Sequence, residues 1–106
     1  MINTRAKMYK ANAKVRKWLL RNEYKNIHFF PHLRFQKGIH VDGQEFDAFC
    51  TKAFHMVLIQ IKSNERQSKK IEEIYHRIRD KYGCEVLWIN VRDRKGIEIN
   101  NRIVVT

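Results

Sequence analysis

Two stretches near the middle of the chain, Phe46-Asp47-Ala48-Phe49-Cys50 and Val57-Leu58-Ile59-Gln60-Ile61-Lys62-Ser63, decide the fold. Both are rich in apolar and β-branched residues, and only a short turn near Lys52 to His55 separates them. We therefore predict two neighbouring antiparallel strands. Alternate side chains of a strand share one face, so Gln60 and Lys62 are expected to project together.

The polar residues of this hairpin predict a site at one edge of the sheet. Antiparallel pairing would carry Asp47 beside Gln60 and Lys62. Mg²⁺ prefers oxygen ligands, so we expect it, or Mn²⁺, at Asp47 and the Gln60 amide oxygen, with the Ile61 carbonyl as a third candidate ligand. Lys62 would orient a water against a phosphate. Asp47, Gln60 and Lys62 are accordingly the predicted catalytic residues. The alternative is an ordinary hairpin whose polar residues face solvent.

An aspartate followed on a hairpin by (D/E/Q)-x-K resembles the PD-(D/E)xK nuclease superfamily. The run Gln60-Ile61-Lys62-Ser63 is similar to the E-x-K-S run of its archaeal and viral Holliday-junction-resolvase-like members. The resemblance implies a restriction-endonuclease-like α/β core, in which a mixed sheet of about five strands is flanked by two helices in the order α-β-β-β-α-β-β. It also implies metal-dependent hydrolysis of DNA phosphodiester bonds, with Mg²⁺ or Mn²⁺ as cofactor.

The resemblance also points to auxiliary site residues. In these families the first helix usually supplies a glutamate within a pattern close to K-G-x-x-x-E, and the run Lys7-Met8-Tyr9-Lys10-Ala11-Asn12 has Asn12 at that place. With Asn12 and Gln60 both neutral, the site has one carboxylate and a lower expected affinity for cations. Glu45 shares strand parity with Asp47 and is the better substitute acid. Ser63 and Gln67 are the remaining polar candidates.

Charge points independently to a polyanionic partner. The 106 residues include 22 Lys and Arg against 11 Asp and Glu, giving a net charge of +11 and a pI near 10.0. No apolar run is long enough to span a bilayer, so we expect no membrane partner and favour DNA, with RNA left open. The alternative is a basic protein of another kind, such as a ribosome-associated one. The basic residues that we expect on phosphates are Lys7, Lys10, Lys14, Lys37, Arg66, Lys69 and Lys70.

The chain reads as one domain, residues 1–106, with no repeats or linkers. Helical spacing of apolar residues predicts one helix from about Thr4 to Asn22 and a second that Asn64 or Ser68 caps and Gly83 ends. The expected strands, besides the central hairpin, are an edge strand Ile27–Gln36 containing Pro31, a strand Glu85–Val91 parallel to the core strand, and a final strand Ile97–Val105. Residues 39–44 are expected to form a hairpin or loop.

Two function classes share this fold prediction. The first is a metal-dependent DNA endonuclease, and the second is a nucleic-acid-binding module whose missing acids leave hydrolysis slow or absent. Paired cutting of a four-way junction would need a symmetric dimer. Cys50 and Cys84 lack metal-type spacing and are expected to be buried thiols of a reducing compartment. No signal peptide is recognisable. We therefore expect a cytoplasmic location, which would be the cytoplasm of an infected cell if the source is viral.

Overall fold

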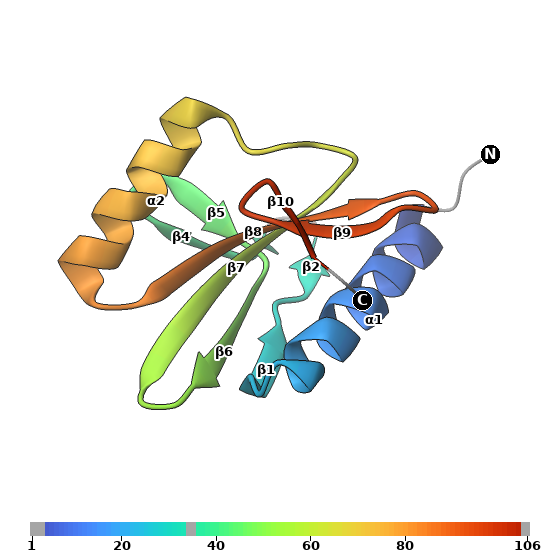
Figure 1. Cartoon of the computed structure of the whole chain (residues 1–106), viewed down its shortest axis with the longest axis horizontal. Coiled ribbons are helices and arrows are strands. Elements are labelled where there is room, and N and C mark those ends of the chain that lie inside the picture. Colours follow the sequence, from blue (N-terminus) through green and yellow to red (C-terminus); the bar gives the residue numbers. More distant parts are fainter. Residues whose placement is uncertain (1–3, 34–35, 105–106) are drawn as a thin grey trace.

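The chain folds around a six-stranded mixed sheet that lies between two helices (Figure 1). The computed structural model describes residues 4–33 and 36–104, with side chains described over 7–31 and 38–104. In spatial order the strands are β1 (Lys25–Phe29), β6 (Ala48–Lys52), β7 (His55–Ser63), β8 (Glu85–Arg92), β9 (Gly96–Ile99) and β10 (Arg102–Val104). The predicted fold class, a mixed sheet flanked by two helices, is confirmed, with six strands rather than about five.

The central strands pair as the sequence predicted. β6 and β7 are antiparallel, with Ala48 opposite Ile59, and a tight turn joins them at Ala53, whose φ of 53° is left-handed. β7 and β8 are parallel and stay in register from Val57 opposite Glu85 onward. Parallel neighbours need a long crossover, and here that crossover contains the second helix.

The two helices cover opposite faces of the sheet, as Figure 1 shows. The first is α1 (Thr4–Arg21) and the second is α2 (Lys69–Tyr82). Strand side chains alternate between the faces, so each helix buries its own core. The core under α1 includes Ala11, Val15, Leu19, Val57, Ile59, Leu87 and Ile89. The core under α2 includes Phe46, Leu58, Tyr75, Ile78, Val86 and Trp88. No helix over the described residues is long and apolar enough to cross a bilayer.

The ends of α2 follow from its sequence. The Ser68 hydroxyl accepts a hydrogen bond from the Ile71 N–H at 3.2 Å, so Ser68, rather than Asn64, is the N-cap. Gly83 ends the helix with a φ of 66° and donates its N–H to the Arg79 carbonyl. The αL conformation at the helix end favours glycine because it has no Cβ.

The structure corrects two expected strands. Ile27–Gln36 is not continuous: β1 ends at Phe29, and beyond Pro31 the chain forms β2 (His32–Leu33) and β3 (Gln36–Lys37), which pair in a separate two-stranded sheet. Proline lacks the N–H that a ladder needs, which explains the break. The expected strand Ile97–Val105 is a hairpin of β9 and β10, because Asn100 and Asn101 both have positive φ and turn the chain.

A second small hairpin occupies the segment that was expected to be a hairpin or loop. It consists of β4 (Ile39–Val41) and β5 (Gln44–Phe46), joined by a turn at Asp42 and Gly43, both with positive φ. Ile39 and Val41 pack against the core under α2. The hairpin ends directly before Asp47 and therefore sets the approach of that residue to the sheet.

Candidate functional site

The predicted catalytic residues lie around one cavity of about 400 Å³. It opens between the N-terminal half of α1, the bend between β5 and β6, and the last residues of β7. The carboxyl end of strands is where open α/β sheets build their sites. Its polar and charged lining residues are Lys7, Asn12, Glu45, Asp47, Gln60, Lys62 and Ser63, and Ile61 also contributes to the lining.

Asp47 is fixed by backbone hydrogen bonds to the strands on both sides. Its N–H donates to the Ile59 carbonyl and its own carbonyl accepts from the Phe30 N–H, both at 2.8 Å. Its carboxylate oxygen Oδ2 accepts a hydrogen bond from the Ile61 N–H at 2.9 Å. Asp47 is buried, at 8% exposure, so these bonds hold a charged group in one orientation.

The Gln60 side chain lies against Asp47, as strand pairing predicted. The end of its amide is 3.0 Å from Asp47 Oδ2 and 2.7 Å from the Glu45 carbonyl oxygen. Both neighbours are hydrogen-bond acceptors, so the amide turns Nε2 toward them and donates to both. Gln60 is buried, at 5% exposure, and in this arrangement it donates to the aspartate that the sequence predicted as its fellow ligand.

The oxygen atoms of these residues are of the types that bind a small hard cation, although together they supply little negative charge. If the amide turns its oxygen inward, an Asp47 carboxylate oxygen, the Gln60 amide oxygen and the Glu45 carbonyl oxygen come together, and all three are ligand types that Mg²⁺ accepts. Only one of the three groups is charged. Over the described residues there is also no cluster of three His, Cys, Asp or Glu that could hold a metal.

The third ligand predicted from the sequence was the Ile61 carbonyl. The contact that Ile61 makes with Asp47 is through its N–H, and the carbonyl that approaches the Gln60 amide belongs to Glu45. Glu45 was predicted as a substitute acid because of its side chain. A carbonyl contact of this kind depends on the bend before Asp47, which no residue pattern indicated.

Lys62 lies two residues after Gln60 on β7 and is half-buried at the cavity. Its ammonium nitrogen is 5.9 Å from the centre of the Trp88 ring, which gives the cation an aromatic neighbour. From α1, Lys7 and Asn12 line the same cavity, so the position that the resemblance assigned to a family glutamate does lie at the site. The basic end of α1 and Lys62 together make one rim of the cavity cationic.

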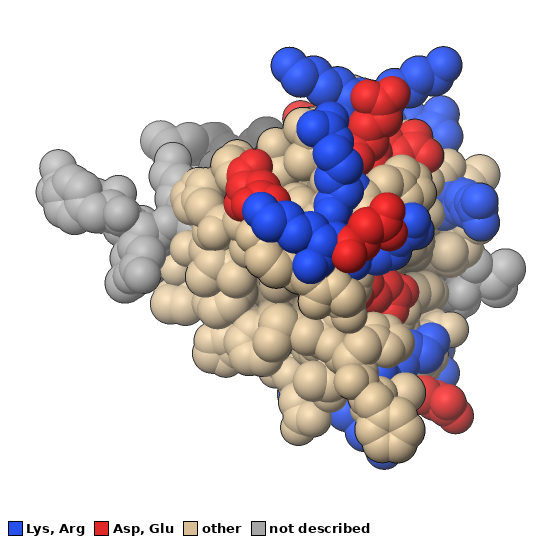
Figure 2. All heavy atoms as spheres, turned by 90° about the vertical axis from the view of Figure 1, so that its left-hand side faces the viewer, with Lys and Arg blue, Asp and Glu red and all other residues tan. Residues whose placement is uncertain are grey.

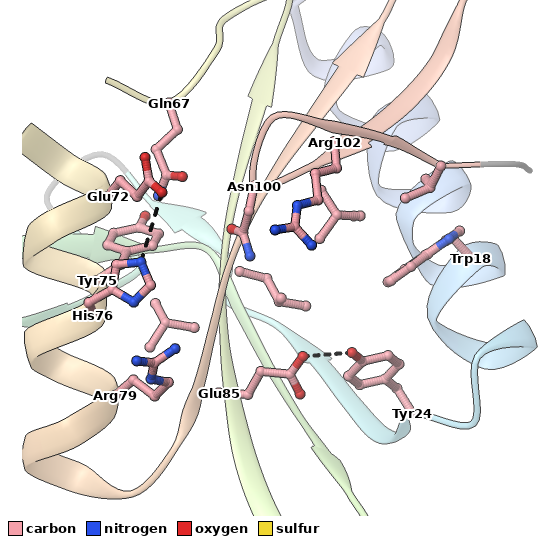
Figure 3. Close-up of a pocket in the computed structure, with 14 residues that line it drawn as sticks. Trp18, Tyr24, Gln67, Glu72, Tyr75, His76, Arg79, Glu85, Asn100 and Arg102 are labelled. Carbon is pink, nitrogen blue, oxygen red and sulfur yellow. Dashed lines mark hydrogen bonds and ion pairs between the residues drawn. The ribbon is translucent and has the colours of Figure 1, made fainter. Parts of the chain in front are cut away.

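Several predicted residues lie elsewhere. Gln67 is buried at 6% exposure and lines a different cavity, of about 430 Å³. That cavity lies beside the start of β8, with α2 on one side and Trp18, Tyr24 and the β9–β10 hairpin on the other (Figure 3). Its Oε1 has no hydrogen-bond partner in the part of the chain that the structure describes. Arg66 turns toward Glu98, 3.7 Å away, and donates to the Asn101 carbonyl. Of the other basic residues predicted on phosphates, Lys10, Lys14, Lys69 and Lys70 are exposed and do not line the Asp47 cavity, and the side chain of Lys37 lies outside the described residues.

The cavity in Figure 3 has mixed charge. Glu72 pairs with His76 at 3.8 Å, and the Tyr24 hydroxyl donates to Glu85 at 2.9 Å. Burial, followed by the bond to Glu85, raises the pKa of the Tyr24 phenol. The predicted catalytic residues Asp47, Gln60 and Lys62 line the other cavity, so we place the candidate site there.

A buried polar network that the sequence did not reveal holds the loop after Lys62. Asn90 donates from Nδ2 to Glu98 at 2.9 Å and accepts the Glu65 N–H at the same distance. Glu98, at 2% exposure, also pairs with Arg92 at 3.3 Å. The only sequence signal was an asparagine within the apolar run of β8. The network fixes the loop that leaves the candidate site.

Comparison with known proteins finds one structural likeness to report and no match by sequence. No family model matches the chain, and no curated protein matches it significantly. Among solved structures, similarity is found to Hjc, a Holliday junction resolvase from the archaeal hyperthermophile Archaeoglobus fulgidus. The TM-score is 0.48, with 11% identity over 85% of this chain and 70% of that chain.

Proposed function

We propose that this chain is a metal-dependent endonuclease that hydrolyses DNA phosphodiester bonds at the Asp47 cavity. The observation that carries the proposal is the convergence of Asp47, Gln60 and Lys62 on one cavity at the carboxyl end of β7. An acid, an oxygen-bearing amide and a lysine at a basic cavity are suited to phosphoryl chemistry. The same residues form the motif that resembles the nuclease superfamily.

Each residue has a distinct part in this proposal. Asp47, the Gln60 amide oxygen and the Glu45 carbonyl would hold Mg²⁺ or Mn²⁺, which when bound neutralises phosphate charge and lowers the pKa of a coordinated water. Lys62 orients the scissile phosphate and the attacking water by donating hydrogen bonds. Lys7, from α1, contacts a neighbouring phosphate at the cavity rim.

DNA is the substrate that we propose, because a net charge of +11 on 106 residues favours a polyanion. RNA would meet the same phosphate-binding residues, so it belongs in the same assay. Preference for four-way junctions is a narrower proposal that requires two copies of the chain to present two sites.

A non-catalytic nucleic-acid-binding module is the second candidate. The hydrogen bonds from the Gln60 amide to Asp47 and to the Glu45 carbonyl favour it, because they satisfy these polar groups without any cation. Asn12 at the cavity supplies no charge in place of the family glutamate. In this function the cavity binds a phosphate without cleaving its ester.

The test is cleavage of labelled single-stranded, duplex and four-way-junction DNA, and of matched RNA, with Mg²⁺, with Mn²⁺ and with EDTA. Lys62→Ala is compared with Lys52→Ala. Lys52 is a matched control because it is also half-buried on the same hairpin, with its ammonium 4.5 Å from the centre of the Tyr24 ring, at the opposite end.

The endonuclease proposal expects metal-dependent cutting that Lys62→Ala abolishes and Lys52→Ala retains. Cutting that survives in Lys62→Ala would overturn the assigned site. Tight binding of wild type without cutting in either metal would favour the non-catalytic module.

A further inference from the structure

Helix α1 carries a continuous basic stripe. The stripe is Lys7, Lys10, Lys14, Lys17 and Arg21, spaced alternately by three and four residues. At about 100° per residue these five positions fall within roughly 80° of the helix circumference. The 18 residues of α1 include no aspartate or glutamate. The stripe therefore has no compensating acid on its own helix.

The C-terminal half of this stripe faces a groove of its own. The groove encloses about 400 Å³ and has Lys14, Lys17 and Arg21 on one side and Arg94 on the other. Arg94 comes from the turn between β8 and β9, where its backbone has a φ of 60°. Trp18 contributes an aromatic wall. None of the described residues lining this groove is acidic.

Several basic residues elsewhere on the molecule are paired with acids. Arg66, Arg79 and Lys81 pair with Glu98, Asp80 and Asp42 respectively. Figure 2 shows basic and acidic side chains interleaved over the α2 face. Like charges brought together around a groove repel one another, and an anion in the groove relieves that repulsion. The charge of the groove therefore suits an anion with several charges.

We propose that the groove formed by Lys14, Lys17, Arg21 and Arg94 is a second phosphate-binding site that holds the nucleic acid engaged at the Asp47 cavity. The inference rests on the proposed function to the extent that the ligand is DNA. Flexible lysines beside arginines are typical of contacts to the phosphate backbone, which fix position without reading sequence.

The length of α1 sets the spacing of the two sites. Lys7 lines the Asp47 cavity, and Lys14 and Arg21 lie about 10 and 21 Å farther along the helix axis at 1.5 Å per residue. At 3.4 Å per base pair, this separation corresponds to roughly three to six base pairs. A duplex bound at the cavity would thus place its flanking phosphates at the groove.

The experiment measures binding of a fluorescent 20-base-pair duplex in EDTA as a function of salt. The test variant is Lys17→Ala/Arg94→Ala, and the matched control is Arg77→Ala/Lys81→Ala on the exposed face of α2. Both doubles remove one lysine and one arginine. If two phosphate contacts are lost, the slope of log K against log salt falls by about 1.8, equivalent to a loss of up to about 60-fold at 0.1 M salt. The control leaves the slope unchanged.

Equal slopes for wild type, test variant and control would overturn the inference. So would binding of wild type to vesicles rich in anionic lipid in preference to the duplex. Thermal melting without DNA confirms that both doubles fold, and Lys17→Glu/Arg94→Glu provides a second variant with a larger expected loss. Failure of the endonuclease proposal is distinguishable, because cleavage depends on Lys62 and the slope measurement needs neither metal nor cutting.

Discussion

Replacement of Gln60 by glutamate tests the contact between the Gln60 amide and Asp47. The amide end lies 3.0 Å from Asp47 Oδ2 and 2.7 Å from the Glu45 carbonyl, and it donates to both. Gln60→Glu has nearly the same shape but substitutes an acceptor oxygen for the donor. It therefore brings two carboxylates into contact at a position that is 5% exposed.

The expected cost can be worked out from this distance. Two unit charges about 3 Å apart at an effective dielectric constant near 20 repel by roughly 5.5 kcal/mol. Protonation of the pair limits the cost, because holding a carboxyl of ordinary pKa about 4.3 neutral at pH 7 costs about 3.7 kcal/mol at 1.36 kcal/mol per pH unit. A proton shared by the pair restores one donor. We expect a loss of about 4 kcal/mol in the free energy of unfolding at pH 7.

The pH dependence has a defined sign. In Gln60→Glu the folded state holds a proton that the unfolded state releases above pH 4.3, so the deficit relative to wild type shrinks as pH falls and is nearly lost near pH 4. Divalent cations should also reduce it, because a cation between two carboxylates favours the folded state by mass action.

Urea unfolding in EDTA and in 10 mM Mg²⁺, between pH 4 and 8, measures these effects. Gln44→Glu is the matched control, because it makes the same change at a half-exposed residue of β5. A Gln60→Glu variant as stable as wild type at pH 7 in EDTA would refute the inferred hydrogen bond between the amide and Asp47. A deficit that does not respond to pH would refute the carboxylate pair.

Three further predictions concern the scaffold. A Cβ on Gly38, where φ is +77°, would clash with the Phe46 carbonyl oxygen. Gly38→Ala should therefore lower the free energy of unfolding by roughly 1–3 kcal/mol in urea titrations and weaken any cleavage through the adjacent Asp47. A fully stable variant would contradict the close approach. Burial, and to a smaller extent the charge of Glu85, raises the pKa of Cys50 to about 12. Alkylation of Cys50 at pH 8 should therefore be slow until urea unfolds the chain. Rapid labelling of the folded protein would be inconsistent with burial. The Asn101 side chain makes two hydrogen bonds of 2.8 Å with the Gln67 backbone. Asn101→Gly tolerates the positive φ but removes both bonds, so it should lower the free energy of unfolding by about 1–3 kcal/mol, measured by thermal melting. An unchanged Tm would mean that Asn101 serves the turn alone.

The sequence correctly predicted the elements that depend on interactions between residues close together in the chain. Strand alternation and the short turn at Ala53 were enough to pair β6 with β7 and to bring Gln60 to Asp47. Ser68 and Gly83 marked the two ends of α2 because capping depends on neighbouring residues. Those contacts are encoded within a few residues, so they could be predicted without the tertiary structure.

The rest depends on contacts between distant segments. Asn100 and Asn101 split the last strand because Asn100 bonds the backbone of Trp88, a residue of another strand. Arg66 was predicted on phosphate, but Glu98, 32 residues later in the chain, pairs with it. A charge pattern along the sequence cannot distinguish an arginine that pairs with a buried acid from one that lines an unpaired groove.

The distribution of acids, as well as that of basic residues, therefore distinguishes the surfaces of this molecule. Helix α2 carries five basic residues against three acids, which partly offset them, so its field should be weaker than that of α1, which carries seven basic residues and no acid. The face that α1 and Arg94 form has no acid among its described lining residues. Counterions are released only where phosphates replace them. The salt dependence of DNA binding should therefore arise from the α1 face, whether or not the Asp47 cavity hydrolyses DNA. The two proposals therefore predict separable effects: Lys17→Ala/Arg94→Ala should weaken binding, and Lys62→Ala should abolish cleavage.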